Sequence, residues 1–545
     1  MKVVTTEEMR RAEQAAVAAG ISLEELMERA GRAVACELLA RLGGPGGAQG
    51  RHVLALVGPG NNGGDALVAG RYLLESGLVV HAYLWKRGTG GDPLVDALEQ
   101  RGGKVVRAEE DDTELNLLRR ELGAVDAVID GLLGMGIQRP LEGRLKEVVE
   151  QVNRLRAPLV IAVDLPTGVQ ADSGQVMGAA VSADVTVTMG FPKRGLYQFP
   201  GAGYAGEVVV ADIGISESML GNAPVELLDA ARVCRLVPRR PRDAHKGAFG
   251  RLLVVAGSIN YTGAPSLAAM AAYRVGAGLV TLAPPRSIYG VLAGRCMETT
   301  FLPLPEGEGG GIGVEAMKVI VDALPAYDAM VVGCGLGQEE ETWSFVRRLL
   351  GVEEGRGQGK LGFLARESRE ERMWELPPLV LDADGLNALA GVEGWWRALR
   401  RGRVVVTPHP GEMARLVGKG TEEVLAARIE LALRAACEWG QVVVLKGAHT
   451  VVANPDGLVA VSPVATPALA TAGTGDVLAG AIGGFLAQGC EPFEAAQLGV
   501  YVHGRAGELL EEEVGVAGGV AGDLLERLPR VLQELRVRAG PANCL

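Results

Sequence analysis

Hydrophobic spacing divides the N-terminal half of the chain into two opening helices and a following series of strands. Residues 23–42 have apolar side chains at intervals of three and four, which is the spacing of an amphipathic helix. Thr5 with Glu8, and Ser22 with Glu25, have the spacing of a capping box at a helix start. Beyond residue 50, short apolar runs alternate with helical stretches, which predicts βαβ units around a parallel sheet. The predicted strands are residues 52–57, 79–85, 127–129 and 159–163.

A second series of the same kind occupies the C-terminal half. Between the two series the pattern becomes irregular, and residues 238–242 read Pro-Arg-Arg-Pro-Arg. Linkers between domains often have such a composition, so we expect the boundary between residues 216 and 240 and assign domains 1–220 and 221–545. The charged, glycine-rich residues 351–376 are expected to form a surface excursion. The strands predicted for this half are residues 252–256, 279–283, 329–333, 379–382, 404–407 and 442–446.

Length and composition support two α/β domains and exclude some classes of function. A chain of 545 residues is too long for one core, and its 4% aromatic content leaves Ala, Val and Leu to fill the layers. The net charge of −12 opposes nucleic-acid binding, and no apolar run reaches the roughly 20 residues that span a membrane. The cysteines form no Cys-x-x-Cys pair, so we expect free thiols in a cytoplasmic protein.

A glycine-rich turn follows the first predicted strand and opens a helix. Gly58, Gly60 and Gly63 satisfy G-x-G-x-x-G, which lets backbone N–H groups approach a phosphate at a helix N-terminus. The next strand ends without a carboxylate for a ribose diol, which disfavours an ordinary nicotinamide dehydrogenase. Two alternatives stay open: Arg87 could accept a 2′-phosphate, or the turn could bind nothing.

Two further polar clusters follow strands in this half. Asp130 begins one of them, and Asp164 and Thr167 lie in the other. The carboxyl ends of parallel strands share one edge of the sheet, so these side chains can converge there with Asn62. Such oxygen ligands suit an alkali or alkaline-earth cation and not zinc. Asp164 is the best candidate for moving protons, with Lys193 as a candidate partner, although the aspartates could also simply cap turns or helices.

The strongest motif of the chain lies in the C-terminal half. Gly473, Thr474 and Gly475 precede Asp476 at the start of a helix predicted over 477–488. Exposed N–H groups there form an anion site, and Asp476 is placed to take the proton of a hydroxyl during phosphoryl transfer. Further candidates at strand ends are the cation Lys446, the histidine His409, and Asp382 with Asp384, which could organise magnesium or cap a turn.

The N-terminal motifs resemble the NAD(P)H-hydrate epimerase family over about residues 1–215. The matching segments are GPGNNGGD, DGLLGMG, VDLPTG, FPKRG and GEVVVADIGI, with Ala66 and Thr167 where the family usually has glycine and serine. The resemblance implies a Rossmann-like domain with potassium bound by Asn62, Asp130 and Thr167. Inversion at the hydroxyl-bearing carbon of the hydrate needs a group that moves protons, and Asp164 is the best candidate for this catalytic residue. The implied hydrate-binding residues are Asn61, Asn62, Gly63, Gly64, Asp65, Gly134, Met135, Gly136, Ile137, Gln138, Arg139, Pro140 and Asp164.

The C-terminal motifs resemble the ribokinase-like superfamily and, within it, the ADP/ATP-dependent NAD(P)H-hydrate dehydratases. The matching segments include HKGAFG, GCGLG, LDADGLNAL, TPHPGEMARL, VVLKGAHT and TAGTGDVLAG. The resemblance implies a magnesium-dependent reaction in which Asp476 is catalytic and contacts the hydrate with Gly337 and His409. The implied nucleotide-binding residues are Lys446, Gly447, Ala448, His449, Thr450, Thr466, Thr471, Ala472, Gly473, Thr474 and Gly475.

Together the two resemblances predict a repair enzyme for hydrated NADH and NADPH. It would interconvert the R and S hydrates and dehydrate the S form with ADP or ATP, ADP being the usual donor in fused bacterial-type proteins. A homo-oligomer without nucleic-acid or membrane partners is expected. Two alternatives are a small-alcohol kinase fused to an NADP-binding domain, which leaves the N-terminal motifs unexplained, and a non-catalytic NADP-binding scaffold, which leaves the aspartates unexplained.

Overall fold

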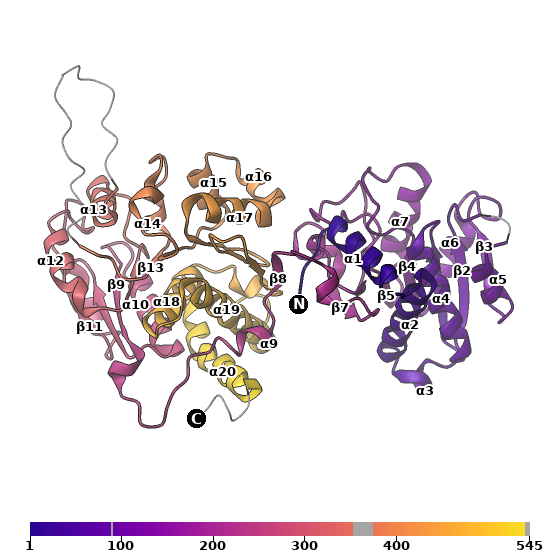
Figure 1. Cartoon of the computed structure of the whole chain (residues 1–545), viewed down its shortest axis with the longest axis horizontal. Coiled ribbons are helices and arrows are strands. Elements are labelled where there is room, and N and C mark those ends of the chain that lie inside the picture. Colours follow the sequence, from indigo (N-terminus) through magenta and orange to yellow (C-terminus); the bar gives the residue numbers. More distant parts are fainter. Residues whose placement is uncertain (89–90, 353–373, 540–545) are drawn as a thin grey trace, which may run out of the picture. The chain divides into compact units, whose positions relative to one another are not determined.

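The chain folds into two compact units, Met1–Glu226 and Leu227–Leu545 (Figure 1). The computed structural model describes residues 1–88, 91–352 and 374–539. The division assigned from the sequence, after residue 220, lies just before the boundary between these units. Most of the excursion predicted at 351–376 falls outside the described residues. Within the described part of the chain, no helix is long and apolar enough to cross a membrane.

The described residues of the first unit form a seven-stranded sheet in which every neighbouring pair is parallel. The strand order β3-β2-β1-β4-β5-β6-β7 contains the Rossmann arrangement. From β1, the chain adds strands first on one side and then, from β4 onwards, on the other side. Ligands of such sheets bind beyond the carboxyl ends of the two strands at this reversal. The strands are β1 (His52–Val57), β2 (Val79–Leu84), β3 (Lys104–Arg107), β4 (Ala127–Gly131), β5 (Leu159–Val163), β6 (Val185–Met189) and β7 (Glu207–Ala211).

Helices cover both faces of this sheet because its strands are apolar on both sides. In β1, Val53 and Ala55 pack into one core with α1, α2 and α4, whereas Leu54 and Leu56 pack into another with α6 and α7. Consecutive residues of a strand point to opposite faces, so a continuous apolar run requires two covering layers. The helices are α1 (Thr6–Ala18), α2 (Leu23–Arg41), α3 (Gly44–Ala48), α4 (Asn61–Glu75), α5 (Pro93–Glu99), α6 (Asn116–Leu122), α7 (Gly143–Leu155), α8 (Ala202–Ala205), and the short η1 (Arg194–Tyr197) and η2 (Glu217–Met219).

The described residues that follow the first sheet in the chain form a second sheet of ten strands. Its order is β11-β10-β9-β12-β13-β14-β15-β16-β17-β8, parallel from β11 to β15 and antiparallel from β15 to β17. Every strand predicted for this half is present. The strands are β8 (Val225–Leu227), β9 (Arg251–Val255), β10 (Leu279–Ala283), β11 (Thr300–Phe301), β12 (Ala329–Val332), β13 (Leu379–Leu381), β14 (Val404–Val406), β15 (Val442–Leu445), β16 (Val451–Ala453) and β17 (Val459–Val461).

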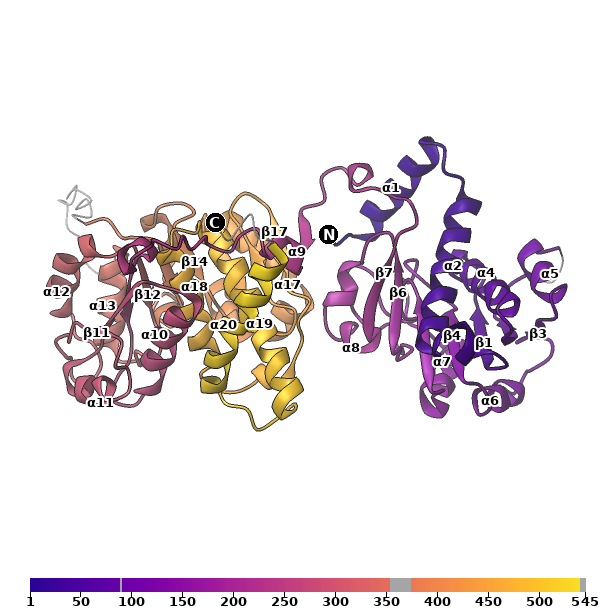
Figure 2. The same cartoon turned by 90° about the horizontal axis from the view of Figure 1, so that it is seen from below.

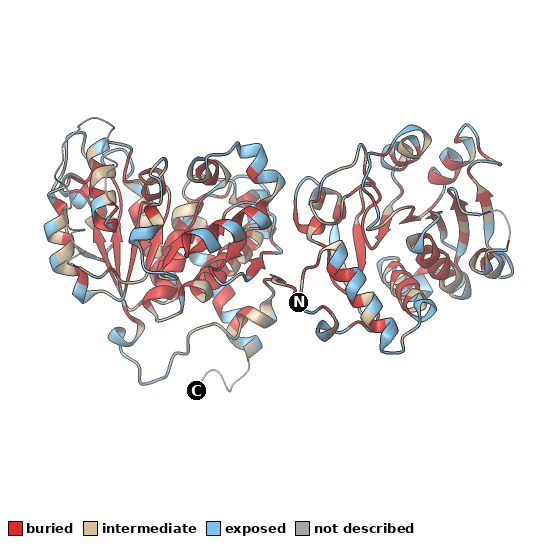
Figure 3. Cartoon of the chain, turned by 45° about the horizontal axis from the view of Figure 1, so that its top comes forward, coloured by how far each residue is buried: buried red, intermediate tan, exposed pale blue. Residues whose placement is uncertain are grey.

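Helices α18 (Thr474–Ala487), α19 (Pro492–Val514) and α20 (Ala521–Ala539) cover one face of the second sheet together with α10 (Gly263–Val275) (Figure 2). Figure 3 shows buried strands between helices whose outer faces are exposed. The remaining helices are α9 (Ala230–Val233), α11 (Tyr289–Ala293), α12 (Ala316–Ala323), α13 (Glu340–Leu350), α14 (Asp384–Asn387), α15 (Pro410–Val417), α16 (Thr421–Ala426), α17 (Arg428–Trp439), and the short η3 (Lys246–Phe249), η4 (Arg286–Ile288), η5 (Leu324–Ala326), η6 (Trp395–Ala398) and η7 (Pro467–Leu469).

Candidate active sites

A cavity of about 650 Å³ opens at the carboxyl ends of β1 and β4 in the first unit. This is the position at which a sheet of this topology binds ligands. The lining includes most of the predicted hydrate-binding residues and adds side chains from the two opening helices. It consists of Arg10, Glu13, Leu23, Leu26, Met27, Ala30, Pro59, Gly60, Asn61, Asn62, Asp65, Leu132, Leu133, Gly134, Met135, Gly136, Ile137, Gln138, Arg139, Leu141, Asp164, Met189, Lys193 and Ile213.

Asp164 and Lys193 form a buried ion pair in the wall of this cavity. The Lys193 ammonium also donates to the Met189 carbonyl at 3.0 Å, and the Met189 amide donates to Oδ1 of Asp164 at 3.0 Å. Asp164 has a positive φ of 65°, a conformation that costs a non-glycine residue energy and often marks functional sites. A carboxylate and an ammonium in direct contact can pass a proton to or from a bound molecule.

Two more carboxyl groups reach the same cavity. Asp65 lies in the first turns of α4 and is buried, and burial, with Asp164 and Glu13 nearby, raises its pKa well above the ordinary value. Burial also raises the pKa of Glu13. The charge of Asp164 adds to this rise, whereas the Lys193 ammonium opposes it. The wall therefore holds two carboxyl groups whose ionised form burial disfavours, beside the ion-paired Asp164.

The predicted cation ligands lie together behind the cavity. Asp130 is fully buried, and its carboxylate accepts from the Thr167 amide and hydroxyl, each at 2.7 Å. Asn62 donates to the carbonyls of Leu133, at 3.3 Å, and Val163, at 2.7 Å. Burial raises the pKa of Asp130 to about 6, although the hydrogen bonds from Thr167 and from the Leu132 amide oppose this rise. The group is rich in oxygen atoms and lacks a positive charge.

Three predicted hydrate-binding residues do not line the cavity. Gly63 lies against the Gly58 carbonyl, where an added Cβ would approach to 2.1 Å, and Gly64 packs against Met27. Pro140 is exposed. The two glycines therefore allow the turn to pack closely. At the start of α4 they contact other parts of the protein and do not face the cavity.

Arg87 holds the same turn. Its guanidinium donates to the carbonyls of Gly58, at 2.9 Å, and Gly60, at 3.2 Å, and to the Asp92 carboxylate at 2.6 Å. These bonds come from Nε and Nη1 and fix the loop between β1 and α4. The geometry thus gives Arg87 a structural role in this turn.

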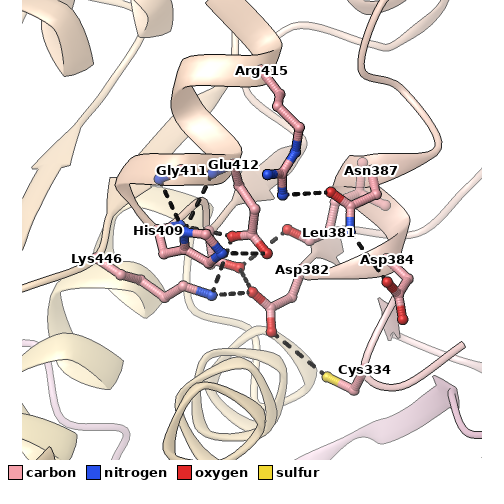
Figure 4. A network of polar contacts seen from close by, with 11 residues as sticks. Cys334, Leu381, Asp382, Asp384, Asn387, His409, Gly411, Glu412, Arg415 and Lys446 are labelled. Carbon is pink, nitrogen blue, oxygen red and sulfur yellow. Dashed lines mark hydrogen bonds and ion pairs between the residues drawn. The ribbon is translucent and has the colours of Figure 1, made fainter. Parts of the chain in front are cut away.

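In the second unit, Lys446, Asp382, Asp476 and Cys334 form a cluster at strand ends. Lys446 Nζ contacts Asp382 Oδ1 at 2.6 Å (Figure 4). Ligand atoms of Cys334, Asp382 and Asp476 all lie within 4.8 Å of one another. Burial, reinforced by Asp382, raises the pKa of Asp476 to about 7, and burial keeps Cys334 a neutral thiol by raising its pKa. Asp476 is therefore an aspartate with the basicity of a general base near neutral pH.

Helix α18 begins at Thr474, earlier than the predicted start at 477, so Asp476 belongs to its first turn. Gly473 precedes it with φ of 93°, a left-handed conformation that glycine adopts without steric cost. A Cβ built on Gly475 would lie 3.5 Å from Lys446 Nζ. The free N–H groups of the helix start and the lysine ammonium thus face the same space, an arrangement that suits phosphate.

His409 is the N-cap of α15 and lies beside this cluster (Figure 4). Its Nδ1 accepts the Gly411 amide at 3.0 Å, and the buried Glu412 completes a capping box. Glu412 also lies 3.8 Å from Lys446 Nζ. Gly337, the other predicted hydrate contact in this unit, donates its amide to Asp384 at 2.9 Å. Asp384 also accepts a hydrogen bond from the Asn387 side chain at 3.1 Å.

The predicted nucleotide-binding loop 446–450 is held from behind by Arg428. This buried arginine donates to the carbonyls of Leu445 and Lys446, each at 3.1 Å, and to that of Ala448. His449 is buried with Nδ1 3.1 Å from the Ser462 carbonyl, and burial lowers its pKa to about 4. Its ring is therefore neutral and packed inside, whereas Thr450 is only partly buried.

The other predicted nucleotide residues lie along the loop that leads into α18. Thr466 caps η7, and the Thr474 hydroxyl donates to the carbonyls of Leu469 and Thr471, each at 3.0 Å. Ala472 is exposed at the turn. These bonds stiffen the loop that ends at the N-terminus of α18.

Sequence reasoning overlooked some residues of both sites. Glu13 and Arg10 line the first cavity, but helical periodicity alone does not say which side of α1 meets a site. Glu412 stood within the quoted TPHPGEMARL segment, and its position three residues after His409 was a signal for a capping box. Cys334 stood in the quoted GCGLG segment, yet nothing local indicates its nearness to Asp476.

Comparisons with known proteins match both units. A family described as YjeF-related protein N-terminus matches residues 23–195, and one described as NAD(P)H-hydrate dehydratase matches residues 252–530. A Thermofilum pendens protein named "Bifunctional NAD(P)H-hydrate repair enzyme Nnr" is 39% identical, covering 98% of this chain and 97% of its own. A Moorella thermoacetica protein of the same name is also 39% identical, covering 89% and 88%.

Among solved structures, the ADP/ATP-dependent NAD(P)H-hydrate dehydratase from Bacillus subtilis, co-crystallised with ATP/Mg²⁺, is 29% identical. It aligns with 58% of this chain and 100% of its own, with a TM-score of 0.45. The two sheets and their strand-end sites define a two-domain α/β enzyme. The chain belongs to the family of bifunctional NAD(P)H-hydrate repair enzymes. The predicted union of an epimerase with a dehydratase is thereby confirmed.

Proposed function

We propose that the first unit epimerises NADH and NADPH hydrates in the 650 Å³ cavity and that the second dehydrates the S form beside Asp476. Each domain, 1–220 and 221–545 as assigned from the sequence, would then have one complete site. The proposed hydrate and nucleotide contacts are those named above, with Gly63, Gly64 and His449 acting through backbone atoms. The observation that carries the proposal is the buried Asp164–Lys193 pair in the cavity wall.

Epimerisation inverts the configuration at C6, the carbon that carries the hydroxyl group. A proton given to the hydroxyl lets it leave as water while the ring nitrogen's lone pair forms a C=N bond. Water then adds to the opposite face and loses a proton. Asp164 is the proposed proton carrier, and Lys193 holds its carboxylate in place through the ion pair.

A potassium ion is proposed at Asn62, Asp130 and Thr167. The donor set fits, because it offers carboxylate, amide and hydroxyl oxygens and a buried negative charge without a cationic side chain beside it. An added Cβ on Gly134 would lie 2.4 Å from Oδ1 of Asn62, so glycine is needed for the loop to approach this amide. When bound, the ion would supply positive charge that holds the 132–137 loop against the hydrate's phosphates.

Exchange of potassium for lithium should slow epimerisation and leave dehydration of the pure S hydrate unchanged. A lithium ion is smaller than a potassium ion, so the same oxygen ligands would hold it less well. The rates should be measured in KCl and in LiCl at equal ionic strength. Asp130→Asn should weaken the apparent potassium affinity by at least about tenfold, since it removes charge from the ligand shell. The exposed Asp96→Asn is the control. Equal epimerisation rates in both salts would refute the ion's role.

The dehydratase reaction combines phosphoryl transfer with elimination. Asp476 is proposed to take the proton of the C6 hydroxyl while the hydroxyl oxygen attacks the nucleotide's terminal phosphorus. This attack releases AMP from ADP or ADP from ATP. The ring nitrogen then expels phosphate, and loss of a C5 proton restores the dihydropyridine. The N-terminus of α18 and Lys446 would stabilise the transferring phosphate.

Magnesium is proposed to enter with the nucleotide. Cys334, Asp382 and Asp476 do not suit magnesium as a binding site, because a thiol is a poor magnesium ligand and Lys446 already pairs with Asp382. The ion would instead be held mainly by phosphate oxygens and neutralise charge that develops on them. ADP as the preferred donor, a homo-oligomeric assembly and a cytoplasmic location complete the proposal.

The function is tested with a mixture of the R and S NADH hydrates, ADP and the full chain. We expect both epimers to be consumed completely, with one AMP and one phosphate formed for each NADH, measured by absorbance at the NADH band and by chromatography. ATP in place of ADP should give a lower kcat/KM. If only the S hydrate is consumed rapidly and the R hydrate disappears only at its slow spontaneous rate, the first unit does not epimerise.

A further inference from the structure

Helix α1 is anchored to the segment that carries Lys193. The Val4 amide donates to the Pro192 carbonyl at 2.9 Å, and the Arg194 amide donates to the Val4 carbonyl at 3.0 Å. The capping box of Thr5 and Glu8 starts the helix directly afterwards. The backbone that positions Lys193 therefore also sets where α1 begins and which way it points.

This anchoring turns one face of α1 towards the cavity. Met9, Ala12 and Ala16 are buried in the core, while Arg10 and Glu13, three residues apart, line the cavity. Residues three apart share a side of a helix, so both follow from one orientation. Burial raises the pKa of Glu13, and its charge is coupled to Lys193 and Asp164. Glu13 therefore faces the proposed reaction space from a helix, while Asp164 faces it from the end of a strand.

We propose that Glu13 is a second catalytic residue of the epimerase, which carries the proton on the ring face that Asp164 does not serve. The proposal adds to the assignment of Asp164 and stands on the shared cavity and on the different elements that present the two carboxyl groups. Inversion at C6 breaks a C–O bond on one face and forms one on the other, so each face needs a group that moves a proton.

The two carboxyl groups exchange roles in each turnover. Protonated Glu13 gives its proton to the leaving hydroxyl, which departs as water, and the ring nitrogen's lone pair closes the C=N bond. Ionised Asp164 takes a proton from the water that adds to C6 on the other face, and the C=N electrons return to nitrogen. Glu13 ends ionised and Asp164 protonated, which is the state required for the reverse direction. Proton exchange with solvent resets the pair.

Glu13→Gln should lower the epimerisation rate on the order of a hundredfold, because the amide cannot carry the proton. Dehydration of pure S hydrate should be unchanged. The matched control is Glu7→Gln on the same helix, whose side chain is 83% exposed. The wild-type kcat/KM should fall as pH rises through the raised pKa of Glu13, and Glu13→Gln should lack this limb. The charged groups facing Glu13 are Lys193, Asp164, Arg10 and Asp65.

Chemical rescue separates a proton carrier from a structural residue. Glu13→Ala should regain epimerase activity as formate is added, whereas Glu13→Gln, whose amide fills the space, should not. A Glu13→Gln variant that epimerises as fast as Glu7→Gln would overturn the proposal, and so would a Glu13→Ala variant that formate does not restore. Asp164→Asn is measured in parallel. If Asp164→Asn is inactive and Glu13→Gln is active, only the catalytic role of Glu13 is refuted. If Glu13→Gln is inactive and Asp164→Asn is active, the catalytic role of Asp164 is refuted.

Discussion

Asp476→Asn should abolish nucleotide-dependent dehydration and leave epimerisation intact. The amide has nearly the size of the carboxylate but cannot accept the hydroxyl proton, so the loss should be on the order of a hundredfold or more. Because burial and Asp382 raise the pKa of Asp476 to about 7, the wild-type kcat/KM should rise with pH through about 7, as the active ionised form accumulates. The residual rate of the variant should lose this rise.

The measurement is NADH formation from pure S hydrate and ADP between about pH 5.5 and 9, which extends roughly two pH units to either side of the pKa of Asp476. Asp456→Asn, an exposed aspartate of the same unit, is the matched control and should behave as the wild type. Nucleotide binding should survive in Asp476→Asn, which shows that the site is folded. Dehydration at the wild-type rate would remove Asp476 from the mechanism.

Asp164→Asn should have the complementary effect: loss of epimerisation with dehydration of the S hydrate retained. The R hydrate would then be consumed only at its spontaneous rate of epimerisation, a fall on the order of a hundredfold or more for loss of a positioned proton carrier. Lys193 is fully buried, so removal of its counter-ion should also destabilise the first unit by about 3–5 kcal/mol. Chiral separation of the hydrates and thermal unfolding measure the two effects.

A double variant distinguishes chemistry from stability. Asp164→Asn with Lys193→Met removes both charges, and it should recover part of the unfolding free energy without recovering epimerase activity. Asp96→Asn, exposed on α5, is the control for the single change. Fast R consumption by Asp164→Asn would assign the proton transfer to another group, with Lys193 next in order.

The glycine-rich turns could be predicted from the sequence because their function depends on local backbone geometry. Gly58, Gly60 and Gly63 stand between a strand and a helix, and Gly473 precedes the helix that contains Asp476. Chain order alone then places these turns at the carboxyl edge of a parallel sheet. The same reasoning brought together Asn62, Asp130 and Thr167, which do lie in one hydrogen-bonded group.

Side-chain direction could not be predicted in the same way. His449 belongs to a correctly located loop, but its ring turns inward to the Ser462 carbonyl. Gly63 and Gly64 belong to the right turn, but they face protein. A motif specifies which residues occupy a turn, whereas the neighbouring elements decide which of them meet the ligand.

The sequence by itself determined the class of fold and the family and indicated the two candidate sites at strand ends, since hydrophobic periodicity and glycine turns are local properties of the chain. Only the tertiary structure decided that α1 presents Glu13 to the cavity of Asp164 and Lys193, and that Lys446 pairs with Asp382 beside Asp476. These residues are far apart in the chain. Their contacts, and the shifted pKa values that follow from burial and neighbouring charge, exist only when the helices and strands have packed.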